Sequence, residues 1–317
     1  MTTLQWLDLA GGCGLFLYGM QLLCAGLDAA ARGPLHRLLL CGMRTLPRAI
    51  LTGAGFTALI QSSSAAALLC IGLAGSGLVP LEGAAGFLLG ANIGTTATAQ
   101  LLALGAGLGP GVWAPLLCFG GALLLLLTRR PAVQDAARLL LGFGLLFGGL
   151  DGVRAAAGPL AQSPWFRRWL TQPGGWAAGL ASGCASSILL QSSSAAVGLT
   201  QALADGTGLG WGRVIPLVLG QNLGACLTPL AAARALGTPQ GRALARFHLL
   251  FNLLGSGLCL VGWAGLARLA PALARQPACG AGVAAFHSLF NLGAVLALAG
   301  LTRPLLHLCG TKKPPGK

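Results

Sequence analysis

The chain has 317 residues, of which 55% are hydrophobic and only 8% are charged. A soluble domain is about a quarter charged, so this composition excludes an ordinary water-soluble protein. The net charge of +14 does not indicate nucleic-acid binding, because the arginines stand in short gaps between apolar stretches and not in one basic patch with interleaved aromatic residues.

Several apolar stretches have lengths suited to membrane helices, which need about 20 mostly apolar residues. Met1–Asp8 has no basic region and no clear cleavage site follows it, so we expect the first stretch to stay in the mature protein. The pattern predicts an all-α polytopic membrane protein and not a barrel. The stretches are residues 9–31, 84–105, 110–128, 139–153, 214–233, 247–267 and 281–301.

An internal repeat organises these stretches. Residues 61–66 and 191–196 both read Gln-Ser-Ser-Ser-Ala-Ala, an offset of 191 − 61 = 130. Such duplication is typical of secondary transporters, whose site lies between the repeats near the membrane midplane. We predict two homologous transmembrane repeats at 1–137 and 138–270, a final transmembrane helix at 271–303 and a basic cytoplasmic tail at 304–317. The offset also relates Gly53 to Gly183, Thr57 to Ser187, Gly90 to Gly220, Asn92 to Asn222, Gly94 to Gly224 and Thr98 to Thr228.

The two Gln-Ser-Ser-Ser segments lie within apolar sequence, at 49–75 and 179–205. Polar groups are costly in hydrocarbon unless other protein groups satisfy them, so they mark a site. Hydroxyls and amides can bind an anion or a cation. Where the helix breaks at the motif, the N-terminus of the following half-helix presents free N–H groups and a positive dipole end to a phosphate-like ligand.

A glycine-flanked asparagine follows each of these segments. Residues 90–96 read Gly-Ala-Asn-Ile-Gly-Thr-Thr, and residues 220–226 read Gly-Gln-Asn-Leu-Gly-Ala-Cys. The glycines permit local unwinding, and freed carbonyls together with Asn and Thr oxygens form the hard-ligand surroundings that sodium prefers. The alternative interpretation is a glycine-rich packing helix.

A shorter repeated motif lies near the end of the chain. His248 and Asn252 are four residues apart, as are His287 and Asn291, so each pair shares one helix face. Two interpretations are open: an interhelical hydrogen-bond pair, or a role in binding substrate or protons.

These motifs, in this order, resemble the sodium/phosphate cotransporter family, the type II Na/Pi symporters of bacteria and animals. The resemblance covers nearly the whole chain and implies inverted repeats, each with a re-entrant hairpin at its Gln-Ser-Ser-Ser segment. It also implies sodium-coupled symport of inorganic phosphate into the cell by alternating access. The phosphate ligands that it implies are Gln61, Ser62, Ser63, Ser64, Gln191, Ser192, Ser193 and Ser194. The sodium ligands that it implies are Gln61, Ser64, Asn92, Thr95, Thr96, Gln191, Ser194 and Asn222.

The chain departs from the family pattern at two places. Ala225 and Cys226 stand where the family repeats two threonines, so we expect a weaker cation site in the second half. The chain also stops at Lys317, where many bacterial relatives continue into a soluble region, so we expect no regulation through such a region. Two alternatives stay open: a symporter of another small oxyanion such as sulfate or a phosphonate, and a non-coupled channel or scaffold of the same fold.

The sequence predicts neither an enzyme nor a cofactor other than sodium as coupling ion. The six acidic residues fall mostly at stretch ends, and no GxSxG, HExxH or Walker motif and no carboxylate pair is present. The expected partners are phosphate, sodium and membrane lipid, with no nucleic acid, and homo-oligomerisation is left open.

Basic residues predict the orientation in a cell inner membrane. If each Gln-Ser-Ser-Ser segment is a hairpin, six of the 20 Lys and Arg residues lie on one side of the membrane. The remaining 20 − 6 = 14 lie on the side of the C-terminus. The positive-inside bias then places the C-terminus in the cytoplasm and the N-terminus outside. Counting the segments as full crossings gives the same tally, so charge does not distinguish a hairpin from a span. The smaller set is Arg154, Arg167, Arg168, Arg213, Arg268 and Arg275.

Overall fold

The computed structural model describes residues 41–60, 62–103, 113–172 and 174–310, with isolated helical residues between 7 and 22. Most of the predicted first helix at 9–31, Gln61 and the end of the predicted tail lie outside the described residues. Over the described ranges the regular elements are helices, apart from one isolated bridge between Gly210 and Pro277. The prediction of an all-α membrane protein is confirmed.

The helices follow one another in two series and a C-terminal group. The first series is α3 (Leu46–Ile60), α4 (Ser63–Gly75), α5 (Leu81–Ala103) and α6 (Trp113–Leu127). The second is α7 (Pro131–Gln162), α8 (Pro164–Thr171), α9 (Trp176–Leu189), α10 (Ser193–Thr207), α11 (Trp211–Ala225), α12 (Leu227–Leu236) and α13 (Pro239–Leu269). The C-terminal group is α14 (Pro271–Arg275), α15 (Gly280–Leu298), the 3-10 turn η2 (Ala299–Leu301) and α16 (Thr302–Leu308).

Two of the predicted domain boundaries fall inside helices. The boundary between 137 and 138 lies within α7, and the boundary at 303 lies within α16. By contrast, α13 ends at Leu269, beside the predicted end of the second repeat at 270. The helix ends depend on local features such as Pro131 at the start of α7, so the predicted repeat boundaries do not mark them.

Three helical stretches in the described part are long and apolar enough to cross a membrane. They contain the predicted stretches 214–233, 247–267 and 281–301. Large apolar side chains are exposed along α13 and α15, including Leu258, Leu266, Leu289 and Leu296, as expected for helix faces in contact with lipid. The three stretches are Trp211–Leu236, Pro239–Leu269 and Gly280–Leu308.

The helices on either side of each Gln-Ser-Ser-Ser segment are short. α3 has 15 residues and α4 has 13, so each is about 20 Å long, less than the roughly 30 Å of a bilayer core. α9 and α10 have 14 and 15 residues. These lengths fit the hairpin interpretation better than a full crossing by either helix.

Glycines bring α3 against α5 and α9 against α11 at equivalent positions. A methyl group on Gly53 would overlap the carbonyl oxygen of Phe87, and one on Gly183 would overlap that of Leu217. Gly183 lies 130 residues after Gly53, and Leu217 lies 130 residues after Phe87. Small residues permit such close backbone approach between membrane helices, so the repeat in sequence is also a repeat in packing.

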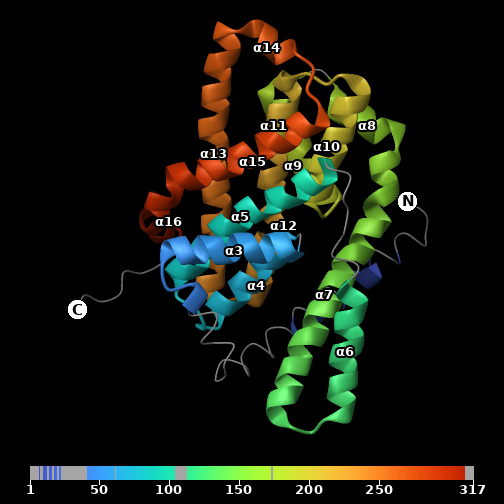
Figure 1. The fold of residues 1–317 in the computed structure, drawn as a ribbon, viewed down its shortest axis with the longest axis vertical. Helices are drawn as coiled ribbons and strands as arrows, with labels where there is room; N and C mark the ends of the chain where they lie inside the picture. Colours follow the sequence, from blue (N-terminus) through green and yellow to red (C-terminus); the bar gives the residue numbers. More distant parts are fainter. Residues whose placement is uncertain are drawn as a thin grey trace.

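The two series interlock through the helices that follow the polar segments. α4 packs against α12 and α13 of the second series, and α10 packs against α5 and α15. Figure 1 shows α13 running behind α5 and α3, with α6 and α7 as a long antiparallel pair to one side. The Gln-Ser-Ser-Ser helix of each half therefore contacts the other half.

Candidate functional site

The helix is broken at both Gln-Ser-Ser-Ser segments. α3 ends at Ile60 and α4 begins at Ser63, while α9 ends at Leu189 and α10 begins at Ser193. The serine before each second helix is its N-cap: Ser62 Oγ accepts from the N–H of Ala65 at 3.4 Å, and Ser192 Oγ accepts from that of Ala195 at 3.2 Å. Serine is a strong N-cap because its oxygen satisfies a backbone donor that the helix leaves free.

Gln191 occupies the break of the second half in a left-handed conformation, with φ of 49°. This conformation is strained for a residue with a Cβ, so the surroundings must hold it. The Gln191 amide nitrogen donates to the Ile188 carbonyl at 2.8 Å, and the amide oxygen accepts from the Thr228 hydroxyl at 3.4 Å. The predicted ligand is thus positioned by both α9 and α12.

Each break places opposite helix ends beside each other in sequence. The last turn of α3 or α9 is the carbonyl end of a helix and carries partial negative charge. In α9 the carbonyls of Ser186, Ser187 and Ile188 accept backbone N–H groups from residues 190–192. The first turn of α4 or α10 has free N–H groups and partial positive charge. Ser62, Ser63, Ser192 and Ser193 are buried at these breaks, and Ser64 and Ser194 are half-buried. Such a break can offer oxygens to a cation and N–H groups to an anion.

The asparagines of the two glycine-flanked motifs lie against the two histidines near the end of the chain. Asn92 Oδ1 lies 3.2 Å from His248 Nε2, and Asn92 Nδ2 donates to Asn252 Oδ1 at 3.2 Å. Asn222 Oδ1 lies 3.4 Å from His287 Nε2. The interpretation as interhelical hydrogen bonds accounts for these contacts, which join α5 to α13 and α11 to α15. A role of Asn92 and Asn222 in binding sodium stays a prediction.

The two threonines of the first motif bond to their own helix. Thr95 Oγ1 donates to the Ala91 carbonyl at 2.8 Å, and Thr96 Oγ1 donates to the Ile93 carbonyl at 2.7 Å. A hydroxyl that donates its proton keeps its oxygen lone pairs, so both can still ligate a cation. In the second half, Cys226 Sγ lies 3.4 Å from the Asn222 carbonyl.

Two further polar side chains belong to this region and were not among the predicted ligands. Thr57 and Ser187 are buried, and neither hydroxyl has a hydrogen-bond partner among the described residues. The offset of 130 relates the two positions, which is the sequence signal that marks them. Periodicity alone does not distinguish them from ordinary helix-packing residues.

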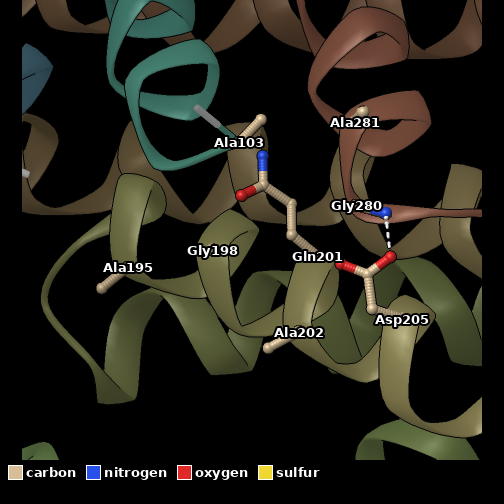
Figure 2. Close-up of a pocket in the computed structure, with 8 residues that line it drawn as sticks. All are labelled: Ala103, Ala195, Gly198, Gln201, Ala202, Asp205, Gly280 and Ala281. Atoms are coloured by element: carbon tan, nitrogen blue, oxygen red, sulfur yellow. Dashed lines mark hydrogen bonds between the residues drawn. The ribbon is translucent and has the colours of Figure 1, made fainter. Parts of the chain in front are cut away.

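A cleft of about 430 Å³ opens beside the second segment. Figure 2 shows its lining, in which the amide of Gln201 and the carboxylate of Asp205 come from α10. Gln201 Nε2 donates to the Ala99 carbonyl at 3.0 Å, and Asp205 Oδ1 accepts from the N–H of Gly280 at 2.7 Å. Ala195, which follows Ser194 in the sequence, also lines the cleft, but none of the predicted ligands among the described residues does.

Comparisons of the sequence with known proteins identify relatives of this chain. The model of the Na+/Pi-cotransporter family matches residues 15–155. "Uncharacterized protein YqeW" of Bacillus subtilis is 30% identical over 298 residues, which cover 92% of this chain and 94% of that protein.

Two other relatives have names that state a substrate. "Putative inorganic phosphate export protein YjbB" of Escherichia coli K12 is 28% identical over 97% of this chain, which spans only 56% of that protein. "Sodium-dependent phosphate transport protein 2C" of Mus musculus is 54% identical over 56 residues, 18% of this chain and 9% of that protein. No solved structure matches the chain.

Proposed function

The chain belongs to the Na+/Pi-cotransporter family, and from that premise we propose that it carries inorganic phosphate across a membrane, coupled to sodium ions. The family is one of transporters, so the protein is a transporter and not an enzyme. Sodium and phosphate would bind together between the two halves, and alternating access would expose them to one side of the membrane and then to the other.

One observation carries this proposal: the two broken helices at the equivalent Gln-Ser-Ser-Ser segments. Each break offers the N-terminal end of α4 or α10 to an anion and the C-terminal end of α3 or α9 to a cation. An anion and a cation bound at neighbouring helix ends stabilise one another, which is the physical requirement for coupling. Phosphate can then bind without a lysine or arginine.

The direction of transport follows from the ion gradients. A symporter moves its substrate along the summed gradients of substrate and coupling ion, so an inward sodium gradient favours phosphate uptake. The name of the YjbB relative states export, which is the opposite direction. Measuring phosphate flux in proteoliposomes with the sodium gradient imposed inward and then outward tests both possibilities. Flux that ignores the sodium gradient would contradict sodium coupling.

The site is tested by Ser63→Ala and Ser193→Ala, each of which removes one buried hydroxyl at a break. We expect uptake of radiolabelled phosphate to fall about 100-fold, because several bound groups depend on one preorganised geometry. Ser76→Ala is the matched control, since Ser76 is the C-cap at the far end of α4 and its hydroxyl donates to the Gly72 carbonyl of the same helix. Full uptake by a correctly inserted Ser63→Ala or Ser193→Ala protein would refute the site.

Another small oxyanion would find the same hydroxyl and N–H donors. Sulfate or a phosphonate should therefore be offered as competitors in the same uptake measurement. Stronger inhibition by sulfate than by unlabelled phosphate would assign the protein to sulfate. Phosphate uptake that does not saturate would indicate a channel.

We propose that the protein lies in a cell inner membrane, and the charge distribution supports a cytoplasmic C-terminus. Arg130, between α6 and α7, then lies on the cytoplasmic side. Arg130→Cys in a background without native cysteines should react with an impermeant thiol reagent only in inside-out vesicles. Reaction from outside intact cells would reverse the orientation.

A further inference from the structure

Thr57 and Ser187 present an unexplained pair of buried hydroxyls. Thr57 is 0% exposed and Ser187 is 3% exposed, and neither hydroxyl oxygen has a hydrogen-bond partner among the described residues. Leaving a buried polar group unsatisfied costs about 1–3 kcal/mol. The same cost recurs at the same position of both halves, because 187 − 57 = 130.

Both side chains lie where the broken helix meets the helix with the asparagine motif. A methyl group on Gly94 would lie 2.7 Å from Thr57 Cβ, and one on Gly224 would lie 2.8 Å from Ser187 Cβ. The backbone carbonyl of Ser187 also accepts from the N–H of Ser192 at 3.2 Å. Ser187 is therefore in direct contact with the second Gln-Ser-Ser-Ser break.

The charge of the local backbone selects the kind of ligand. Thr57 lies in the last turn of α3 and Ser187 in the last turn of α9. The aligned peptide dipoles make the C-terminal end of a helix partially negative, so it attracts a cation and repels an anion. Hydroxyl and carbonyl oxygens are also the hard ligands that a sodium ion prefers.

We propose that the hydroxyl oxygens of Thr57 and Ser187 are ligands of the coupling sodium ions, one in each half of the protein. This inference rests on the proposed sodium-coupled transport and adds two ligands to the predicted set. Phosphate binds on the other side of each break, at the N-termini of α4 and α10. The hydroxyls are buried without a protein partner because the cation is their partner.

Thr57→Val tests the proposal, because valine keeps the shape of threonine and removes only the hydroxyl. Sodium should raise the thermal midpoint of the purified wild-type protein relative to potassium at equal ionic strength, since a ligand of the folded state stabilises it. In Thr57→Val, the sodium concentration for half of this effect should rise about tenfold, equivalent to about 1.4 kcal/mol of binding free energy. Half-maximal sodium in phosphate uptake should shift in parallel.

Two variants provide matched controls. Thr57→Ser keeps the hydroxyl and should stay within about twofold of the wild type, well under one decade of affinity. Thr52→Val removes a hydroxyl of the same helix that already bonds to the Gly42 carbonyl at 3.2 Å, and it should leave sodium dependence unchanged. Ser187→Ala tests the second half in the same way. It also keeps the proposal testable if Thr57→Val does not fold.

The outcomes separate this inference from the proposed function. A wild-type protein without sodium-dependent stability or uptake would refute sodium coupling itself. A sodium-dependent wild type with unchanged curves for Thr57→Val and Ser187→Ala would refute only the two ligands. A shift in phosphate affinity at saturating sodium, without a shift in sodium dependence, would assign the hydroxyls to the anion and overturn the proposal.

Discussion

The two halves share their packing but differ along the helix that carries the asparagine motif. α5 is continuous through Thr95 and Thr96, whereas the equivalent segment of the second half is divided at Cys226 into α11 and α12. Pro229 explains the division, because it has no N–H and in a continuous helix its ring would clash with the Ala225 carbonyl. Its counterpart in the first half is Ala99, since 229 − 130 = 99.

The comparison separates the residues that both halves need for folding from the residues that differ and can give each half its own role. The glycine contacts and the serine N-caps are present twice, so they form the common scaffold. The residues after each asparagine motif are not duplicated, because Ala225 and Cys226 stand where the first half has two threonines. We infer that the halves contribute unequally to cation binding, and the following changes test that comparison.

The largest effect is expected at the glycines that join the helices of each half. An added methyl group at Gly90 would overlap the Ile50 carbonyl, and one at Gly220 would overlap the Leu180 carbonyl. Gly90→Ala and Gly220→Ala should each destabilise the protein by about 3 kcal/mol, the upper end for overpacking. Thermal melting in detergent measures this loss. Gly55→Ala is the control, because an added methyl group there meets no atom within 4 Å. Unequal losses at Gly90 and Gly220 would show that the scaffold is not equivalent in the two halves.

The next effect concerns the threonines that distinguish the halves. The double change Thr95→Ala with Thr96→Cys copies the second half into the first and removes two hydroxyl oxygens. Half-maximal sodium for uptake should rise about tenfold, with phosphate affinity at saturating sodium little changed. Both hydroxyls donate to carbonyls of their own helix, so the alternative interpretation is that they serve only that helix and bind no sodium. Superimposable sodium curves for the wild type and the double variant would establish that local role.

A smaller loss of stability is expected on replacing Asn252 or Asn291, which lie four residues after His248 and His287. Asn252 accepts from Asn92 and donates to the His248 carbonyl, whereas Asn291 donates to the His287 carbonyl. Asn252→Ala should therefore cost about 1 kcal/mol more than Asn291→Ala, the value of one additional hydrogen bond. Parallel thermal melts of the two variants measure the difference. Equal losses would mean that the Asn92 contact adds nothing to stability.

A loss of stability of similar size is expected at Asp205, which has no counterpart in the first half because the equivalent residue is Gly75. Its carboxylate accepts from the N–H of Gly280 at the start of α15. Asp205→Ala should cost about 1 kcal/mol of stability as a lost helix cap, and Asp205→Asn, which keeps an acceptor oxygen, only a few tenths. If Asp205→Asn destabilises as much as Asp205→Ala in thermal melts, then the charge and not the cap is what stabilises this helix end.

The sequence by itself determined the membrane character, the duplication and the position of both polar breaks. These properties depend on composition and on local rules: apolar length, a recurring hexamer, and a serine that caps the helix after it. A further local rule, the helix-breaking effect of proline, explains why α11 ends where it does, since Pro229 is visible in the sequence. Whether the segments are hairpins in the membrane remains a prediction.

Only the tertiary structure decided which polar groups meet. Asn92 lies beside His248, 156 residues away, and no periodicity within either helix specifies that pairing. The tertiary structure also distinguishes Thr57 and Ser187, whose hydroxyls are buried without partners, from Thr95 and Thr96, whose hydroxyls bond to their own helix. A helical pattern specifies the face on which a side chain lies, but its partner depends on how the two halves pack against each other.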